Sequence, residues 1–147
     1  MKKTIFCSIL ILLLSLGLCA CGVQGTKEDD AFNVSVKNEC DGEIYGFHIE
    51  YGLGEEALGG GVCVNADGSA VKRGDTFNFS YTSKEFPEGT DDISSFNARL
   101  YVITDEEGAE HLAGEPIELD AKFGEEKTLT VSGNETDGFL IQQGDIN

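Results

Sequence analysis

His48 and His111 are the only histidines in a chain of 147 residues, so any catalytic mechanism that needs an imidazole base must use one of them. A serine nucleophile needs a general base, and no G-x-S-x-G turn is present. Neither H-x-x-x-H nor H-E-x-x-H, the common zinc spacings, occurs. Paired carboxylates for sugar cleavage are available, but most Phe and Tyr residues fall on inward positions of strands rather than along a cleft. We therefore predict a non-enzyme and keep a small hydrolase, with His48 or His111 as its base, as the less favoured alternative.

Acidic pairs raise the question of a calcium site. Ca²⁺ needs several oxygen ligands converging on one point, and neighbouring residues of a strand point to opposite faces. No glycine turn has the spacing of an EF-hand loop. The best candidates are Asp91 and Asp92, in the irregular segment 83–95. Solvated turn residues explain these acids more simply, so we expect no cofactor and keep a Ca²⁺-dependent module as an alternative.

Arg99 and Tyr101 are the candidate partner-binding residues. They lie on the outward phase of an alternating stretch, and Arg and Tyr are enriched where proteins bind one another. Ile103 shares this phase, which would instead suit the covered second face of a central strand. The sequence leaves the two interpretations open.

Cys40 and Cys63 form a second open question. A bridge between them would close a loop of 24 residues and stabilise the fold by about 3 kcal/mol in the chain-entropy model. Their separation in space cannot be read from the sequence, so a disulfide and two free thiols remain equally acceptable. The pair is not a C-x-x-C motif, which argues against thioredoxin-like redox chemistry.

The elements that must position these residues are predicted to be strands. Apolar and polar residues alternate with a period of two along most of the chain from Phe32 onward, and no stretch keeps a helical period. Turn signals at Asp41-Gly42, 65–68, 105–108 and Asp137-Gly138 separate the alternating runs and predict hairpins. Several short strands in one domain predict an all-β fold, an antiparallel β-sandwich of immunoglobulin- or fibronectin-like layout. The aligned inward residues are Phe32, Val34, Val36, Tyr45, Phe47, Ile49, Tyr51, Phe77, Phe79, Tyr81, Phe96, Ala98, Leu100, Val102, Ile117, Leu119, Ala121, Phe123, Leu129, Val131, Phe139 and Ile141.

The N-terminal residues suggest where in the cell the protein is located. Two lysines precede an uncharged run from Ile5 to Leu18, which at about 21 Å is short for a bilayer core of about 30 Å and suits a secretory signal peptide. Residues 18–21, Leu-Cys-Ala-Cys, resemble the lipobox of bacterial lipoproteins. The resemblance covers residues 1–21 only and implies a diacylglyceryl lipid on Cys21, cleavage before it, and anchoring to the cell membrane on its extracytoplasmic face. Two acyl chains suffice for stable anchoring. The alternative is an uncleaved membrane span.

These boundaries divide the chain into a signal peptide (1–20), a lipidated N-terminus with a flexible acidic tether (21–31) and a β-sandwich domain (32–147). The net charge of −17 disfavours nucleic acid and anionic lipid headgroups as ligands, and permits cations and basic partners. Solubility is the simpler explanation of this charge. The sequence thus predicts a small lipid-anchored, non-catalytic binding or interaction module of the cell envelope, whose partner is an envelope protein or a basic molecule.

Overall fold

The all-β prediction is confirmed by a computed structural model, which describes residues 23–24 and 30–144. The proposed signal peptide and Cys21 lie outside the described residues. Within the described ranges, no helix has the length and apolar character of a membrane span. The elements are β1 (Val23–Gln24), β2 (Phe32–Cys40), β3 (Gly46–Leu53), β4 (Glu56–Val64), β5 (Thr76–Tyr81), the 3₁₀ turn η1 (Ser83–Glu85), β6 (Phe96–Ile103), β7 (Glu110–Leu112), β8 (Ile117–Leu119), β9 (Glu126–Asn134) and β10 (Gly138–Gln143).

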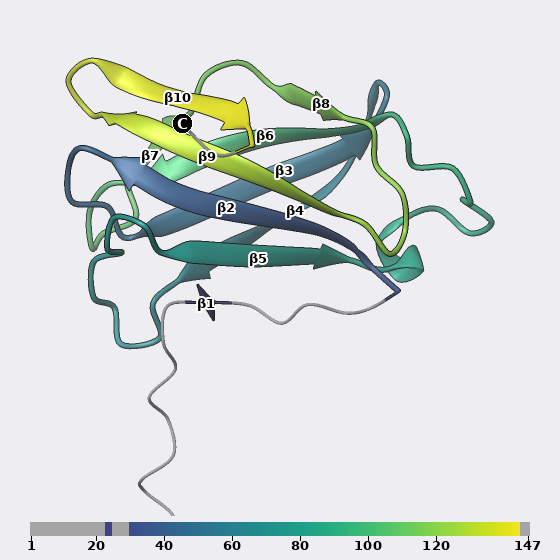
Figure 1. The fold of residues 1–147 in the computed structure, drawn as a ribbon, viewed down its shortest axis with the longest axis horizontal. Helices are drawn as coiled ribbons and strands as arrows, with labels where there is room; N and C mark the ends of the chain where they lie inside the picture. The colour runs from purple at the N-terminus through teal and green to yellow at the C-terminus, as the bar shows by residue number, and fades with distance from the viewer. Residues whose placement is uncertain (1–22, 25–29, 145–147) are drawn as a thin grey trace, which may run out of the picture.

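Two sheets stack face to face as a β-sandwich (Figure 1). The first sheet has the order β1-β5-β2-β9-β10, and the second has the order β4-β3-β6-β7, with β8 also paired to β6. The pairs β2–β5 and β4-β3-β6-β7 correspond to B–E and C′-C-F-G of an immunoglobulin-type sandwich, as expected. Both sheets are predominantly antiparallel, as predicted, and the two parallel strand pairs of the described residues are β1–β5 and β2–β9. β9 lies beside β2, where strand A would lie, and it runs parallel to β2.

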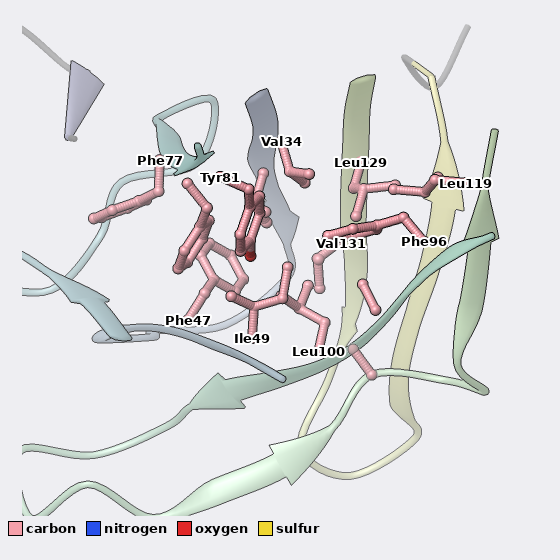
Figure 2. Close-up of a cluster of buried hydrophobic side chains, with 14 of the residues drawn as sticks. Val34, Phe47, Ile49, Phe77, Tyr81, Phe96, Leu100, Leu119, Leu129 and Val131 are labelled. Atoms are coloured by element: carbon pink, nitrogen blue, oxygen red, sulfur yellow. The ribbon is translucent and has the colours of Figure 1, made fainter. Parts of the chain in front are cut away.

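The predicted inward residues form the core between the sheets, with the exception of Tyr45. Tyr45 precedes β3, and its hydroxyl is hydrogen-bonded to Glu43 at the surface, so the prediction is wrong at this residue. Phe47, Ile49 and Leu100 of the second sheet face Val34 and Val131 of the first, as Figure 2 shows. Aromatic rings fill one end of this core, where Phe96 lies 5.0 Å from both Phe32 and Tyr81 between ring centroids. The period-two alternation therefore identified the buried face of each strand that it covered.

Two of the four predicted hairpins form. The turn at 105–108 joins the antiparallel pair β6–β7, and Asp137-Gly138 joins β9–β10. The turn at Asp41-Gly42 instead carries the chain from β2 to β3, in the opposite sheet, and the turn at 65–68 carries it from β4 to β5. Turn residues allow the chain to reverse, but they do not decide whether the next strand pairs with the last one or crosses the sandwich.

Strand β4 has weak alternation because it contains Gly59-Gly60-Gly61, and the sequence analysis did not identify it as a strand. Packing explains these glycines. A Cβ on Gly59 would lie 3.1 Å from the ring of Tyr51, and one on Gly60 would lie 2.8 Å from the carbonyl oxygen of Ile49. The glycines therefore let neighbouring residues of β3 approach the strand closely.

The predicted tether begins to fold before residue 32. Within it, Val23–Gln24 form β1, which pairs in parallel with the outer edge of β5, and Ala31 is fully buried. Residues 23–24 and Ala31 therefore contact the domain within the segment predicted to be a tether. Backbone groups at the open edge of β5 offer hydrogen bonds to any chain that passes beside them, which a composition-based prediction does not register.

Candidate functional site

The outer face of the second sheet is the candidate site. Val62, His48, Tyr101 and Leu112 are direct cross-strand partners, so they form one row across β4, β3, β6 and β7. We call these four residues the outer row. Val62 is 55% exposed and Leu112 is 46% exposed, while His48 and Tyr101 are half-buried. A row of large side chains across a whole sheet presents an apolar and aromatic surface to solvent.

The centre of the outer row is held by stacking and hydrogen bonds. The His48 and Tyr101 rings stack with centroids 5.3 Å apart and an interplanar angle of 21°. His48 Nδ1 lies 3.0 Å from Oε1 of Glu110 on β7. The Tyr101 hydroxyl donates to Oε2 of Glu50 at 3.1 Å. These contacts fix both rings before any partner arrives, which lowers the ordering cost of binding.

Arg99, the other predicted partner-binding residue, lies one row away on the same face. Its Nη1 is 3.8 Å from Oε2 of Glu50, the carboxylate that also accepts from Tyr101. The structure therefore brings Arg99 and Tyr101 together on one solvent-facing surface. Arg99 also lines a small depression of about 200 Å³, which it shares with Asn97, Glu56 and Pro116. Ile103, on the same phase, is buried, in contrast to Arg99 and Tyr101.

A larger hollow of about 660 Å³ adjoins the outer row. We call its lining residues with apolar surface, Tyr45, Val62, Val64 and Ile103, the floor, and its acidic lining residues the rim. We call it the acidic hollow, because its lining also contains Asp67, Gly68, Asp105, Glu106, Gly108 and Glu110 and no lysine or arginine. Its volume falls within the range of about 300–1,000 Å³ that is usual for ligand pockets.

Acidic side chains near Tyr45, a residue that lines the hollow, act on its phenol. The phenol donates to Oε1 of Glu43 at 2.8 Å, and this hydrogen bond is the largest cause that raises the pKa of Tyr45 to about 12. Partial burial and the carboxylates of Glu43, Glu106 and Glu107 raise the pKa further. A phenol that resists ionisation in this way reports a locally negative potential.

Asp91 and Asp92 are exposed and are not joined by a third ligand. Oδ1 of Asp92 accepts from the backbone N–H of Ser94 at 2.9 Å, which lowers the pKa of Asp92. In the described part of the chain, no group of three or more His, Cys, Asp or Glu side chains converges on a point that could hold a metal ion. The Asp92 carboxylate therefore accepts a hydrogen bond within its own turn.

Cys40 and Cys63 are free thiols in the structure, on different sheets. Cys40 is buried at the end of β2, where its thiol contacts the carbonyl oxygen of Val131 at 3.8 Å. Cys63 is half-buried in β4, with the carbonyl oxygen of Asn78 at 3.9 Å. Burial raises the pKa of the Cys40 thiol to about 12 and also raises that of Cys63. Neither thiol is activated as a nucleophile.

The histidines do not complete a serine-type constellation. His48 faces Glu110, and Nε2 of His111 lies 3.5 Å from Oε1 of Glu135. Over residues 30–144, neither ring is hydrogen-bonded to a serine, threonine or cysteine. Each histidine thus faces a carboxylate that could orient it as a base, and among residues 30–144 no nucleophilic side chain is hydrogen-bonded to either ring.

Comparison with known proteins leaves the chain without an assigned family. No family model matches it, and no curated protein matches it. Among solved structures, a protein from Eubacterium rectale determined by NMR aligns over 84% of this chain and all of its own length, with 10% identity and a TM-score of 0.44. A disulfide-locked mutant of intermedilysin with human CD59 aligns over 80% of this chain and 24% of its own, with 9% identity and a TM-score of 0.33. These similarities are too distant to bear on function.

Proposed function

We propose that this protein is a small, non-catalytic binding module of the bacterial cell envelope, held at the extracytoplasmic face of the membrane by a lipid on Cys21. The module binds an envelope protein through the outer face of its second sheet. The observation that carries the proposal is the outer row, in which two exposed aliphatic side chains flank a pre-stacked His48–Tyr101 pair. Exposed apolar surface with fixed aromatic anchors is typical of protein-binding sites.

The lipid anchor is supported by the lipobox-like residues 18–21 and is tested separately. Mass spectrometry of the protein from membranes should find a chain that begins at Cys21 and carries acyl groups. A Cys21→Ser variant should then leave the membrane fraction. A mature chain that begins at Met1 with an unmodified Cys21 would instead support an uncleaved span.

Binding through the outer row can be tested by site-specific photo-crosslinking in intact membranes. A benzophenone amino acid at position 112, in the full chain, should form a discrete adduct with one envelope protein. The control position is 140, because Leu140 is 65% exposed but lies on β10 of the first sheet. Adducts of equal yield from both positions, or none from position 112, would contradict the proposal.

A further inference from the structure

We infer that the acidic hollow receives a cationic, extended segment of the partner protein, in which lysine or arginine residues alternate with aliphatic ones. This inference rests on the proposed function and specifies the chemistry of its partner. The aliphatic side chains would pack on the floor of the hollow, and the cationic groups would meet its rim. One segment can satisfy both because successive side chains of an extended chain point to opposite sides.

The floor of the hollow supplies the apolar half of the interaction. Val62 and Val64 lie on the outward phase of β4, and they are 55% and 46% exposed. Val62 belongs to the outer row as well, so the hollow and the row form one continuous surface. Covering these side chains removes apolar area from water. This favours association but does not discriminate between cationic and anionic partners.

The rim of the hollow supplies the selection by charge. Asp67, Asp105, Glu106 and Glu110 line the hollow together with the floor. The charge of Glu106 also acts on Tyr45 of the floor, where it adds to the larger effect of the hydrogen bond to Glu43 in raising the pKa of the phenol. Arg99, the basic residue on the same face, lies in another row and faces Glu50 rather than the hollow. A negatively charged or neutral occupant would leave these carboxylates without compensation, whereas a cationic one complements them.

The same charges argue against the other occupants of such a face. A second copy of this chain would bring its own excess of acidic residues, 27 against 10 basic ones, toward the hollow. An anionic lipid surface would be repelled for the same reason. A metal ion would need converging ligands, and the described residues hold no such group.

The inference can be tested with a defined probe. The ¹⁵N-labelled full chain, in a non-ionic detergent, is titrated with an acetylated and amidated peptide of alternating lysine and valine, and its amide shifts are followed by NMR. We expect saturable shifts confined to β4, the end of β6 and the turns at 65–68 and 105–108. The same peptide with glutamate or glutamine in place of lysine should bind at least about tenfold more weakly.

Matched variants separate this site from the general attraction of an acidic protein for any cation. Glu106→Gln with Glu110→Gln should raise the Kd of the lysine peptide about threefold to tenfold, since each exposed charge contact contributes modestly. Glu115→Gln with Glu118→Gln removes the same charge from exposed positions around β8, outside the hollow, and should leave the Kd unchanged. Val62→Thr with Val64→Thr keeps β-branched side chains in β4 and should weaken binding severalfold.

Equal Kd changes in the two glutamate double variants would overturn the inference, as would shifts centred on another face or equal binding of the glutamate peptide. If these results came with a discrete crosslink from position 112, the proposed function would stand and only the chemistry of its partner would be wrong. If position 112 gave no adduct while the lysine peptide still bound in the hollow, the proposed function would fail by itself.

Discussion

The Tyr81 hydroxyl is the one buried side-chain polar atom in the described residues that has no hydrogen-bond partner. Its oxygen points into the apolar cluster in Figure 2, and burial raises the pKa of the phenol. A buried hydroxyl without a partner costs about 1–3 kcal/mol. We predict that Tyr81→Phe stabilises the protein by about 1 kcal/mol, which thermal and urea unfolding would both detect.

Tyr51 provides the matched control for this prediction. Its ring lies 4.6 Å from that of Tyr81, but its hydroxyl donates to the carbonyl oxygen of Glu85 at 3.1 Å. Tyr51→Phe should therefore destabilise the protein by about 0.5–1.5 kcal/mol. A loss of stability in Tyr81→Phe as large as that in Tyr51→Phe would show that the Tyr81 hydroxyl has a partner, such as a buried water.

The buried thiol of Cys40 makes a prediction about reactivity. With a pKa of about 12, roughly one molecule in ten thousand carries the thiolate at pH 8. We predict that iodoacetamide at pH 8 leaves Cys40 unmodified in the folded protein and modifies it in urea, while the half-buried Cys63 reacts sooner. Peptide mapping by mass spectrometry distinguishes the two sites, and rapid labelling of Cys40 in the folded state would contradict its burial.

The raised pKa of Cys40 also makes the stability of the protein depend on pH. The folded state favours the protonated thiol, because the pKa is raised from its ordinary value of 9.0. This contribution is fully present below about pH 9 and is lost as the pH rises from 9 toward 12. The free energy of unfolding of the wild type should therefore fall more steeply above pH 9 than that of Cys40→Ala.

Among the strands, the hairpin β9–β10 depends on Gly133. This residue has a φ of 95°, and a Cβ there would overlap the carbonyl oxygen of Gly138. We predict that Gly133→Ala destabilises the protein by about 2–3 kcal/mol, through backbone strain and the clash together. Unfolding in urea would measure the loss.

Two other glycines calibrate this prediction. Gly138 has a φ of 94° but open space around it, so Gly138→Ala should cost only the backbone strain, about 1–2 kcal/mol. Gly42 has neither a positive φ nor a close neighbour, and Gly42→Ala should be neutral or stabilise by up to about 1 kcal/mol. Equal effects at all three positions would show that the hairpin geometry is wrong.

The strands that follow a period of two were predictable, because alternation between Phe47, Ile49 and Leu100 and their polar neighbours records which face is buried. Strand β4 was not, because glycines carry no side chain to show the pattern. The parallel pairing of β2 with β9 could not be predicted from the sequence either. Alternation shows that residues such as Val36 and Leu129 are buried, but it does not show which strand lies beside which.

The candidate site was predictable only in part. The outward phase of Arg99 and Tyr101 could be read from their strand, and the structure places both on the solvent-facing surface. The other members of the outer row come from three further strands, and cross-strand register is a property of the assembled sheet. Val62 and Val64 were a weak sequence signal of an apolar outer surface. They could have been interpreted in this way only if residues 56–64 had been predicted to form a strand.

At the scale of the whole molecule, the dominant feature is unbalanced charge, with 27 acidic residues against 10 basic ones. Like charges on a compact fold repel one another, and salt screens this repulsion within about 10 Å at 0.1 M. We predict that raising NaCl from 20 to 300 mM stabilises the protein by about 1 kcal/mol in urea unfolding. Destabilisation by salt would contradict this, because it would mean that attractive ion pairs dominate.

Calcium provides a second arm of the same experiment. Asp91 and Asp92 have no third ligand among the described residues, so CaCl₂ at matched ionic strength should change the free energy of unfolding no more than NaCl does. A clearly larger stabilisation by millimolar CaCl₂ would restore the calcium-dependent alternative. Asp91→Asn with Asp92→Asn would then show whether these two carboxylates are responsible.

The parallel pair β2–β9 has a consequence for how the protein is made. Residues 33–40 pair with residues 126–133, which are far away in sequence, and in the described residues β2 is otherwise paired only with β5. Contacts so distant in sequence form late. During synthesis, a chain that stops short of β9 leaves the middle strand of its first sheet open along one side, where a chaperone or another nascent strand can attach. The ribosome must therefore have synthesised β9 before β2 is paired on both sides.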